Sequence, residues 1–256
     1  MLHLAGVSYT RSIELAEEEQ PVYRAMLRRA LRVGLVVALV AWACSACGGA
    51  GGQEQAKAQP LPEKRQDLHP GEYHSEEFKP SLTFRLGKEW ANDPPEVSEE
   101  LGLTWRWKGT ANLYFFNFQK VFEPTKSGSE DEVDAPKDMV SWFQHHPYLH
   151  ASKPKPVTVG GVKGEQFDVI PDVPDRYTGA CSFEPDTVPG CLDISRLTSG
   201  TGLVVFAEGY KERIIVLEDV KGETVTIDFG TPPGKKFYEF TAETQKVLDT
   251  VKWTGS

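Results

Sequence analysis

Apolar and polar residues alternate along several stretches of the chain after residue 80, and this period of two is typical of β-strands with one buried face. In the segment S-L-T-F-R-L, for example, polar residues separate Leu82, Phe84 and Leu86. The same alternation, or a short run of β-branched and aromatic residues, predicts strands at 82–86, 103–107, 113–122, 156–159, 162–169, 203–208, 212–218 and 223–229. The connections between the last three runs are short, which favours an antiparallel meander.

Two segments have the spacing of amphipathic helices instead. Residues 136–146 begin with Pro136, after Asp134 or Ala135 as the cap, and carry an apolar stripe. Residues 235–250 place a second set on one face: Phe237, Phe240, Thr244, Val247, Leu248 and Val251. Many strands with two separated helices predict an α+β fold, in which the helices cover an antiparallel β-sheet.

A third apolar segment lies near the N-terminus and is shorter than a membrane span. Val33–Ala43 contains 11 residues and follows a run with three arginines, Arg28, Arg29 and Arg32. A basic segment before roughly 7–15 apolar residues is typical of a secretory signal peptide, whereas a membrane-spanning helix needs about 20. An uncleaved membrane anchor is the open alternative. Both interpretations place the C-terminal part outside the cytoplasm.

The apolar segment ends in W-A-C-S-A-C-G-G, which contains Cys44 and Cys47. A cysteine after small residues at this position resembles the lipobox of bacterial lipoproteins. The resemblance implies that the thiol receives a diacylglycerol and that the cysteine becomes the new N-terminus. Cys47 is the favoured acceptor and Cys44 the alternative, because the bulky Trp42 precedes Cys44. A redox dithiol or zinc site fits less well, since glycines follow the pair and no further ligands lie nearby.

These observations divide the chain into four parts. Residues 1–25 carry acids where a signal peptide should be basic, so we interpret them as a mis-called extension before a start at Met26. Residues 26–47 form the lipoprotein signal peptide. Residues 48–72 are rich in Gly, Gln, Pro and charge, which predicts a flexible tether with a reach of roughly 25–30 Å. Residues 73–256 form a single α+β extracytoplasmic domain of ordinary size.

The charge of the chain limits its partners. The formal net charge is −9, and removal of residues 1–47, which carry five arginines and four acidic residues, leaves −10. An acidic domain disfavours nucleic acid and an electrostatic hold on anionic lipid. Attachment to the membrane would then depend on the lipid anchor.

Two cysteines are left after removal of the signal peptide, and they flank the turn-rich segment C-S-F-E-P-D-T-V-P-G-C. In an exported protein, Cys181 and Cys191 predict a disulfide bond, which would stabilise the fold by about 2–3 kcal/mol for so small a loop. An exposed redox pair is the alternative.

The order of the segments carries a second resemblance. S-L-T-F-R-L-G-K-E-W, then V-G-G-V-K-G-E-Q-F-D, then V-L-D-T-V-K-W after the last helix are similar to motifs of secreted domains of the Mog1/PsbP-like fold. The resemblance spans most of residues 78–253. It departs at Gly87, where a proline is common, and in a long insert at about 171–200. It implies the fold but no activity, because this fold hosts unrelated roles.

Three histidines, His145, His146 and His150, invite a metal-binding interpretation. Pro147 breaks the helix between His146 and His150, so these two side chains do not share a helix face. A histidine at a helix C-terminus is also stabilised by the helix dipole without a ligand. We therefore predict no metal site and no cofactor.

Aromatic residues on two neighbouring predicted strands are a candidate ligand platform. Trp105 and Trp107 share one strand face, and Tyr114 and Phe116 lie on the next strand. An open face would present a surface for a sugar or an apolar ligand. If the C-terminal helix covers this face, the residues belong to the core, which is the interpretation we favour.

Common local catalytic motifs are missing from the sequence. We therefore interpret the protein as a membrane-anchored extracytoplasmic lipoprotein that acts as a non-catalytic binding or accessory module. Its partner would be an envelope protein or a small molecule. Two alternatives stay open: a hydrolase-type enzyme with a site assembled from distant residues, including His145, His146 and His150, and a structural component of the envelope.

The lipid anchor leads to a direct prediction. Metabolic labelling with a fatty-acid analogue is expected to mark the wild-type chain, and Cys47→Ala combined with Cys44→Ala is expected to abolish both the label and membrane retention. The single variants identify the acceptor. Unchanged labelling and retention in the double variant would show that no lipid is attached at either cysteine.

Overall fold

The architecture is set by a large sheet whose neighbouring strands are antiparallel. In the computed structural model the described residues are 57–106, 111–124, 132–174, 177, 190–198 and 202–255, and all belong to the unit Gly52–Ser256. Their strands are β1 (Gln59–Pro60), β2 (Asp67–Leu68), β3 (Gly71–His74), β4 (Leu82–Leu86), β5 (Trp90–Val97), β6 (Glu100–Trp105), β7 (Ala111–Phe116), β8 (Lys120–Phe122), β9 (Glu132–Asp134), β10 (Leu149–Ala151), β11 (Lys155–Val159), β12 (Val162–Pro171), β13 (Cys191–Arg196), β14 (Leu203–Ala207), β15 (Lys211–Val220), β16 (Glu223–Thr231) and β17 (Lys252–Trp253). Their helices are α1 (Met139–His145) and α2 (Lys235–Leu248).

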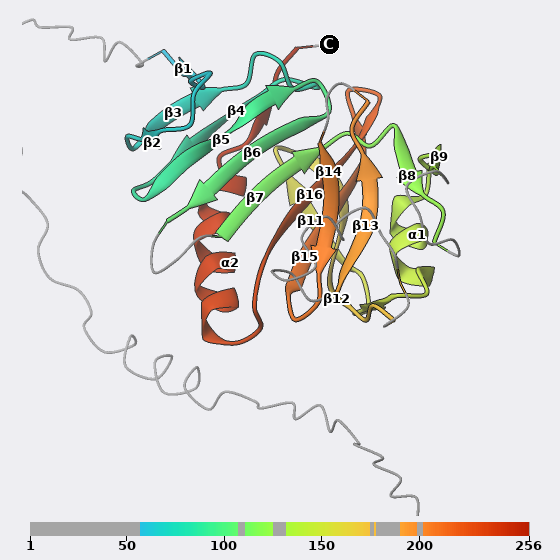
Figure 1. The fold of residues 1–256 in the computed structure, drawn as a ribbon. Coiled ribbons are helices and arrows are strands. Elements are labelled where there is room, and N and C mark those ends of the chain that lie inside the picture. Colours follow the sequence, from blue (N-terminus) through green and yellow to red (C-terminus); the bar gives the residue numbers. More distant parts are fainter. Residues whose placement is uncertain are drawn as a thin grey trace, which may run out of the picture. The chain divides into compact units, whose positions relative to one another are not determined.

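The main sheet has nine strands among the described residues, in the order β10-β12-β15-β16-β7-β6-β5-β2, with β11 beside β12. A second sheet has the order β1-β3-β4-β17, and two separate hairpins are β13–β14 and β8–β9 (Figure 1). The pairing of β1 with β3 is parallel, and the other registers are antiparallel. The mainly antiparallel sheet of the predicted α+β fold is therefore confirmed.

The central strands β7, β15 and β16 are buried on both faces. In β15, for example, Ile215 and Leu217 belong to one apolar cluster, while Ile214 and Val216 belong to the other. This explains the unbroken apolar run in E-R-I-I-V-L-E, because a strand with two buried faces does not alternate with polar residues. Both faces of the sheet consequently need a covering layer.

Helix α2 and the second sheet cover the first face. Phe240 of α2 stacks on Trp105, with ring centroids 5.6 Å apart, and contacts Trp90 and Phe229 edge-on or tilted. The predicted apolar face of this helix is confirmed at its buried positions, Phe237, Phe240, Thr244, Val247 and Leu248. Among the described residues, no helix combines the length and apolar character needed to cross a bilayer.

The opposite face is covered differently from our prediction, because helices contribute little there. Helix α1 adds Met139, Val140 and Phe143, and the β13–β14 hairpin adds Leu192, Ile194, Val204 and Phe206. Figure 1 shows this hairpin in orange in front of the main sheet. The hairpin's first strand lies in the segment that we had interpreted as an insert.

Helix α1 begins later than predicted. Its N-cap is Asp138, whose Oδ1 accepts a hydrogen bond from the Ser141 backbone N–H at 2.8 Å. Pro136 therefore precedes the helix instead of occupying its first turn, because Asp138, and not Asp134 or Ala135, caps the first N–H groups.

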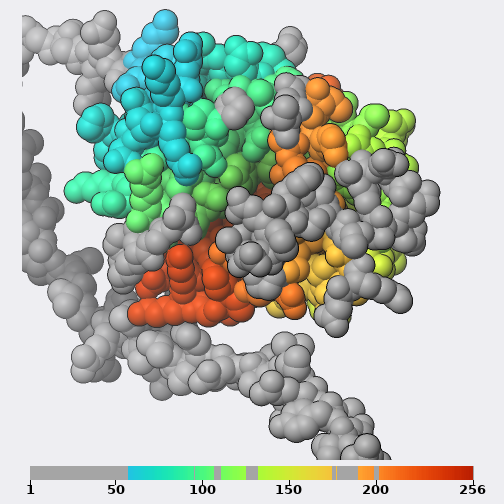
Figure 2. Space-filling view, in the orientation of Figure 1, coloured from blue at the N-terminus to red at the C-terminus, as the bar shows by residue number. Residues whose placement is uncertain are grey.

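Residues 57–72, which we predicted as part of a flexible tether, are ordered on the domain. β1 pairs with β3, and β2 pairs with β5. The side chain of Asn92 anchors the segment between them: its Nδ2 donates to the carbonyls of Pro62 and Lys64, and its Oδ1 accepts from Gln66 N–H. Figure 2 shows these N-terminal strands in blue and cyan on the surface of the unit. The rest of the predicted tether, 48–56, lies outside the described residues.

Two strand predictions needed correction. The predicted strand 113–122 is two strands, β7 and β8, because the chain leaves the main sheet after Phe116. Strand β5 was not predicted, and its Pro94 and Pro95 lack the N–H groups that a ladder needs. Its register with β6 is interrupted between Asp93 and Val97, which accommodates the two prolines.

The contact between α2 and the sheet predicts a large stability effect. Phe240→Ala should lower the free energy of unfolding by about 3–5 kcal/mol, because Phe240 is fully buried among three aromatic rings. Tyr238→Ala is the matched control on the same helix, since this side chain is 66% exposed. Urea denaturation would measure both. Equal effects of the two substitutions would contradict the packing described here.

Candidate functional site

Two carboxyl side chains are buried side by side on the sheet face that carries the β13–β14 hairpin. The register of β15 and β16 pairs Glu212 with Gly230 and Ile214 with Asp228. Glu212 and Asp228 are therefore diagonal neighbours on the same face of two adjacent strands. They are 8% exposed each.

Gly230 makes room for the Glu212 carboxyl. A Cβ atom at position 230 would overlap Glu212 Oε2 and lie 2.5 Å from the carbonyl oxygen of Lys211. Glu212 thus lies back over the neighbouring strand, at the place where any other residue would present a side chain. This close approach explains why a glycine stands at position 230 of β16.

Burial changes the protonation of the pair. Loss of hydration raises the pKa of Glu212 to about 7. Burial, and then the charge of Glu212, hold the pKa of Asp228 well above its usual value. Within the described part of the chain, Asp228 Oδ1 is buried without a hydrogen-bond partner. An unpaired buried acceptor lowers the stability of the fold by about 1–3 kcal/mol. A ligand that donates a hydrogen bond to Asp228 would remove this cost.

Tyr114 on β7 lies next to the pair and connects it to further acids. Its hydroxyl donates to Asp93 Oδ2 at 2.8 Å. Burial, and then the Asp93 charge, raise the pKa of Tyr114, with smaller contributions from Glu100 and Asp228. The ring lies close to β6 because Gly102 has no side chain: a Cβ there would be 2.8 Å from Tyr114 Cε1.

Arg65 partly balances these acids from the N-terminal segment. Its Nη2 lies 3.4 Å from Asp93 Oδ1 and donates to Thr104 Oγ1 at 3.2 Å. Thr104 in turn donates to Asn112 Oδ1 at 3.1 Å. Arg65 therefore holds Asp93, which accepts the hydrogen bond of Tyr114. It also holds Thr104, which donates to Asn112. At Glu100, burial followed by the Asp93 charge raises the pKa to about 7.

A cavity of about 260 Å³ opens beside the carboxyl pair, and we call it the acidic pocket. It is lined by Glu212, Asp228 and Gly230 from β15 and β16, by Ala111, Asn112 and Tyr114 from β7, and by Val205, Ala207 and Tyr210 from β14 and the turn after it. Val205 is 37% exposed and Tyr210 is 40% exposed, so the pocket reaches the surface on this side. The pocket combines buried acids, two tyrosines and small apolar residues.

The predicted aromatic platform is not a single surface. Trp105 faces α2 and is 6% exposed, whereas Tyr114 and Phe116 lie on the other sheet face, stacked with centroids 5.3 Å apart. Trp105 pairs with Ala111, so these two side chains lie on the same face of the sheet. Tyr114 is an odd number of positions further along β7, which places its side chain on the opposite face. Trp107 lies outside the described residues.

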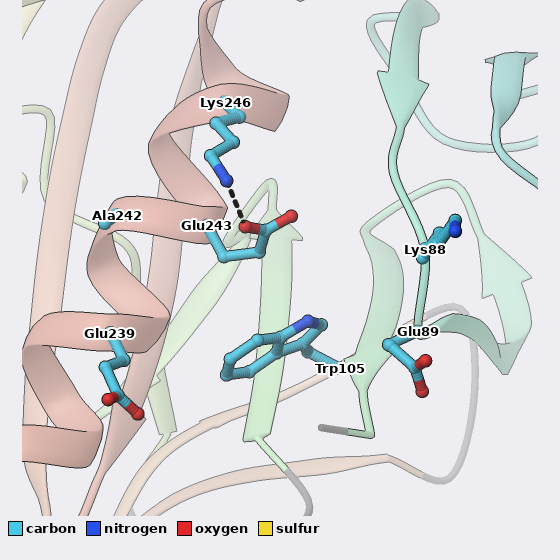
Figure 3. A pocket seen from close by; sticks show the side chains of 7 residues that line it. All are labelled: Lys88, Glu89, Trp105, Glu239, Ala242, Glu243 and Lys246. Atoms are coloured by element: carbon cyan, nitrogen blue, oxygen red, sulfur yellow. Dashed lines mark hydrogen bonds and ion pairs between the residues drawn. The ribbon is translucent and has the colours of Figure 1, made fainter. Parts of the chain in front are cut away.

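Trp105 nevertheless borders a surface groove of about 430 Å³. Figure 3 shows its indole between α2, which carries Glu239, Glu243 and Lys246, and the turn with Lys88 and Glu89. Lys246 Nζ pairs with Glu243 Oε2 at 2.6 Å across one helix turn. The charges around this groove are mixed in sign and at least partly exposed, which gives it no clear preference for a ligand.

The predicted histidine set is not brought together as one site. His146 is buried against Trp142 and Tyr148, and its Nδ1 accepts from Tyr148 N–H at 3.2 Å. Burial lowers the pKa of His146 to about 4. His150 is exposed and pairs with Asp172 at 3.0 Å, while His145 contacts Ser141 within α1. Throughout the described ranges, no three His, Cys, Asp or Glu side chains are grouped as a metal site would require.

The predicted cysteine sites fall largely outside the described residues. Cys44, Cys47 and Cys181 all lie there. Cys191 is described: it is buried at the start of β13, where it pairs in register with Ala207 of the acidic pocket. The disulfide and the lipid anchor therefore stay predictions.

The sequence did not lead us to Glu212, Asp228 or Tyr210. The sequence did contain a signal for Asp228. This acid lies between Ile227 and Phe229, in a strand with two buried faces, and Gly230 follows two positions later. A lone acid in such a strand is costly unless it is neutralised. Its neighbour on β15 could not be identified without the register.

The fold and the acidic pocket define an α+β domain with a two-faced antiparallel sheet and a buried carboxyl site. No family model and no curated protein matches the sequence. Among solved structures, the Saccharomyces cerevisiae Ran-binding protein Mog1p is similar at 8% identity and a TM-score of 0.38, over 72% of this chain and 96% of that chain. LpqN, described as involved in cell envelope biogenesis of Mycobacterium tuberculosis, is similar at 8% identity and a TM-score of 0.33, over 75% and 91%. Mog1 is also named by the sequence resemblance, but similarity this low carries no conclusion about function.

The raised pKa values predict how stability depends on pH. A carboxyl whose pKa is higher in the folded state binds its proton more tightly there, so its stabilising contribution is complete below about pH 4.5 and is lost as the pH rises through about 7. Glu212→Gln removes this loss. Relative to wild type, the variant should gain roughly 1–3 kcal/mol in unfolding free energy between pH 4.5 and pH 8.

The control for this comparison is Glu165→Gln, at an exposed position of β12. The contribution of His146, which has the opposite sign because its pKa is lowered, is common to all variants and cancels. Urea denaturation at the two pH values measures the difference. Parallel pH profiles for wild type and Glu212→Gln would show that Glu212 is not buried as an acid.

Proposed function

We propose that this protein is an exported, lipid-anchored binding module and that the acidic pocket holds its ligand. The observation that carries the proposal is the buried Asp228 carboxyl, which lines an open cavity and has an oxygen without a partner among the described residues. Polar groups of this kind inside a mostly pre-formed pocket are typical of small-molecule sites. The cavity volume suits a small ligand better than a protein segment.

The anchor and the disulfide are parts of the same proposal. Lipidation at Cys47, or alternatively at Cys44, would hold the domain at the outer side of the membrane. A Cys181–Cys191 bond would fasten the chain at the start of β13, and the β13–β14 hairpin supplies one side of the pocket through Val205 and Ala207. The disulfide would thus stabilise the cover of the ligand site.

Acid–base catalysis is a second candidate function, favoured by one observation. Two coupled carboxyls with raised pKa values are a recurrent arrangement in hydrolases, where one is protonated and the other is not. The described pocket contains neither a nucleophile activated by a base nor a group of oxyanion donors. Binding therefore remains the function that the geometry supports best.

Binding in the acidic pocket can be tested by filling the pocket. Ala207→Trp should occlude it, because Ala207 is a small, half-buried residue of its wall. We expect at least one member of a panel of small probes, namely choline, the uncharged carbon isostere of choline, glucose and acetate, to shift amide resonances of pocket residues in the wild type. The same probe should leave the Ala207→Trp variant unchanged.

Ala242→Trp is the matched control, since Ala242 lies on the Trp105 groove instead. This variant should bind the probe as the wild type does. The proposal is wrong if no probe shifts pocket resonances in the wild type, or if Ala207→Trp binds as well as Ala242→Trp. Conversion of a probe, or of a chromogenic ester or glycoside, that depends on Glu212 would support the catalytic candidate.

A further inference from the structure

We propose that the ligand of the acidic pocket is a small organic cation, an ammonium or guanidinium compound, which binds in exchange for a proton. This inference rests on the proposed function, because it assigns a chemical class to the ligand of the same site. Four features of the pocket support it: a described lining without a basic residue, the carboxyl oxygen that has no partner among the described residues, the two tyrosines and the burial of both acids.

The pocket contains two acids, and its described walls contain no base that would balance their charge. None of the residues that line it in the described structure is Lys, Arg or His. Lys211 and Arg213, the nearest cations along β15, lie on the other sheet face, where both pair with Asp168 at 2.7 Å and approach the ring of Phe237. Arg65 is held by Asp93 and Thr104. A cationic ligand would supply the missing charge.

The lining chemistry also suits an organic cation better than other ligands. Tyrosine rings attract ammonium and guanidinium groups through their π-faces, and Tyr114 and Tyr210 both line the pocket. A calcium ion would need six to eight oxygen ligands, but the described residues show no group of three acids, histidines or cysteines that could hold a metal. An anion would be repelled by Glu212 and Asp228.

The side chains described around the carboxyl pair include phenolic, acidic and apolar groups. The elements around the pair bring Tyr114 from β7 and Tyr210 from the β14–β15 turn, with Asp93 and Glu100 beyond Tyr114. β12 places the apolar Val169 opposite Glu212. With two buried acids on neighbouring strands, a proton held by Glu212 relieves the repulsion between them.

Entry of a cation would replace that proton. The proton leaves to solvent and the ligand's positive charge takes its place, so the pocket keeps the same net charge. Affinity should then fall about tenfold for each pH unit below the pKa of the pair. The pKa of Glu212, raised to about 7 by burial, places this loss just below neutral pH. Such a module would bind its cationic ligand at neutral pH and release it at acidic pH.

The test compares choline with its uncharged carbon isostere, which has the same shape. Titrations followed by amide resonances of pocket residues should show choline binding at least about tenfold tighter than the isostere at pH 8. Between pH 6.5 and pH 5.5, the affinity for choline should fall about tenfold. Asp228→Asn should weaken choline binding by a similar factor.

Two further variants keep the test decisive. Tyr210→Leu alters an exposed residue of the pocket rim and should weaken choline binding even if Asp228→Asn alters the fold. Glu239→Gln changes an acid at the Trp105 groove and should leave choline binding unchanged. Equal binding of choline and the isostere, or binding of choline that does not depend on pH, would overturn the cation proposal but leave the pocket as a ligand site. Absence of any probe from the pocket would instead overturn the proposed function.

Discussion

The structure depends on the burial of three central strands on both of their faces. β7 and β15 carry apolar side chains in both directions, and β16 carries apolar side chains on one face and the buried Thr226 and Asp228 on the other, so neither face is left to water. On one face α2 and the second sheet supply the cover, with Phe240 stacked on Trp105. On the other face the cover is made from pieces: α1, the β8–β9 hairpin and the β13–β14 hairpin. The acidic pocket lies where this second cover does not fill the space above β7, β15 and β16.

This arrangement explains how two acids come to be buried in a pocket whose described lining contains no basic residue. Gly230 gives the Glu212 carboxyl a place over the neighbouring strand, and Gly102 lets the Tyr114 ring lie close to β6. The hairpin then shields both acids from water. The resulting cost is reduced by protonation, since burial raises the pKa of both carboxyls. Two buried acids lower the stability of the fold, so their presence is more easily explained by a ligand that binds them than by folding alone.

Much of the framework could be predicted from the sequence. Period-two alternation identified most long strands, and the apolar face of 235–250 identified α2, because these patterns depend on local geometry. The N-terminal boundary could not be predicted. Residues 57–72 have the composition of a linker, yet Asn92 holds three of their backbone groups, and Arg65 from this segment supports Tyr114 through Asp93. Contacts between residues so far apart in the sequence leave no local pattern.

The candidate site was less predictable than the fold. Sequence patterns directed attention to aromatic residues and histidines, and the structure separates both sets: Trp105 and Tyr114 lie on opposite faces, and His146 is buried while His150 is exposed. Glu212 and Asp228 are 16 positions apart, and their proximity follows from the register of β15 and β16. A one-residue shift of that register would move one acid to the other face. Pairing, and not composition, creates the pocket.

The central claim is that Glu212 and Asp228 share a buried, proton-holding site, and their carboxyl resonances test it most directly. Titration of the side-chain carboxyl carbons by NMR, with assignments from Glu212→Gln and Asp228→Asn, would follow each acid from pH 3 to pH 9. The account predicts that Glu212 titrates near pH 7 and that the pKa of Asp228 lies well above its usual value. Ordinary titration of both acids near pH 4 would contradict it.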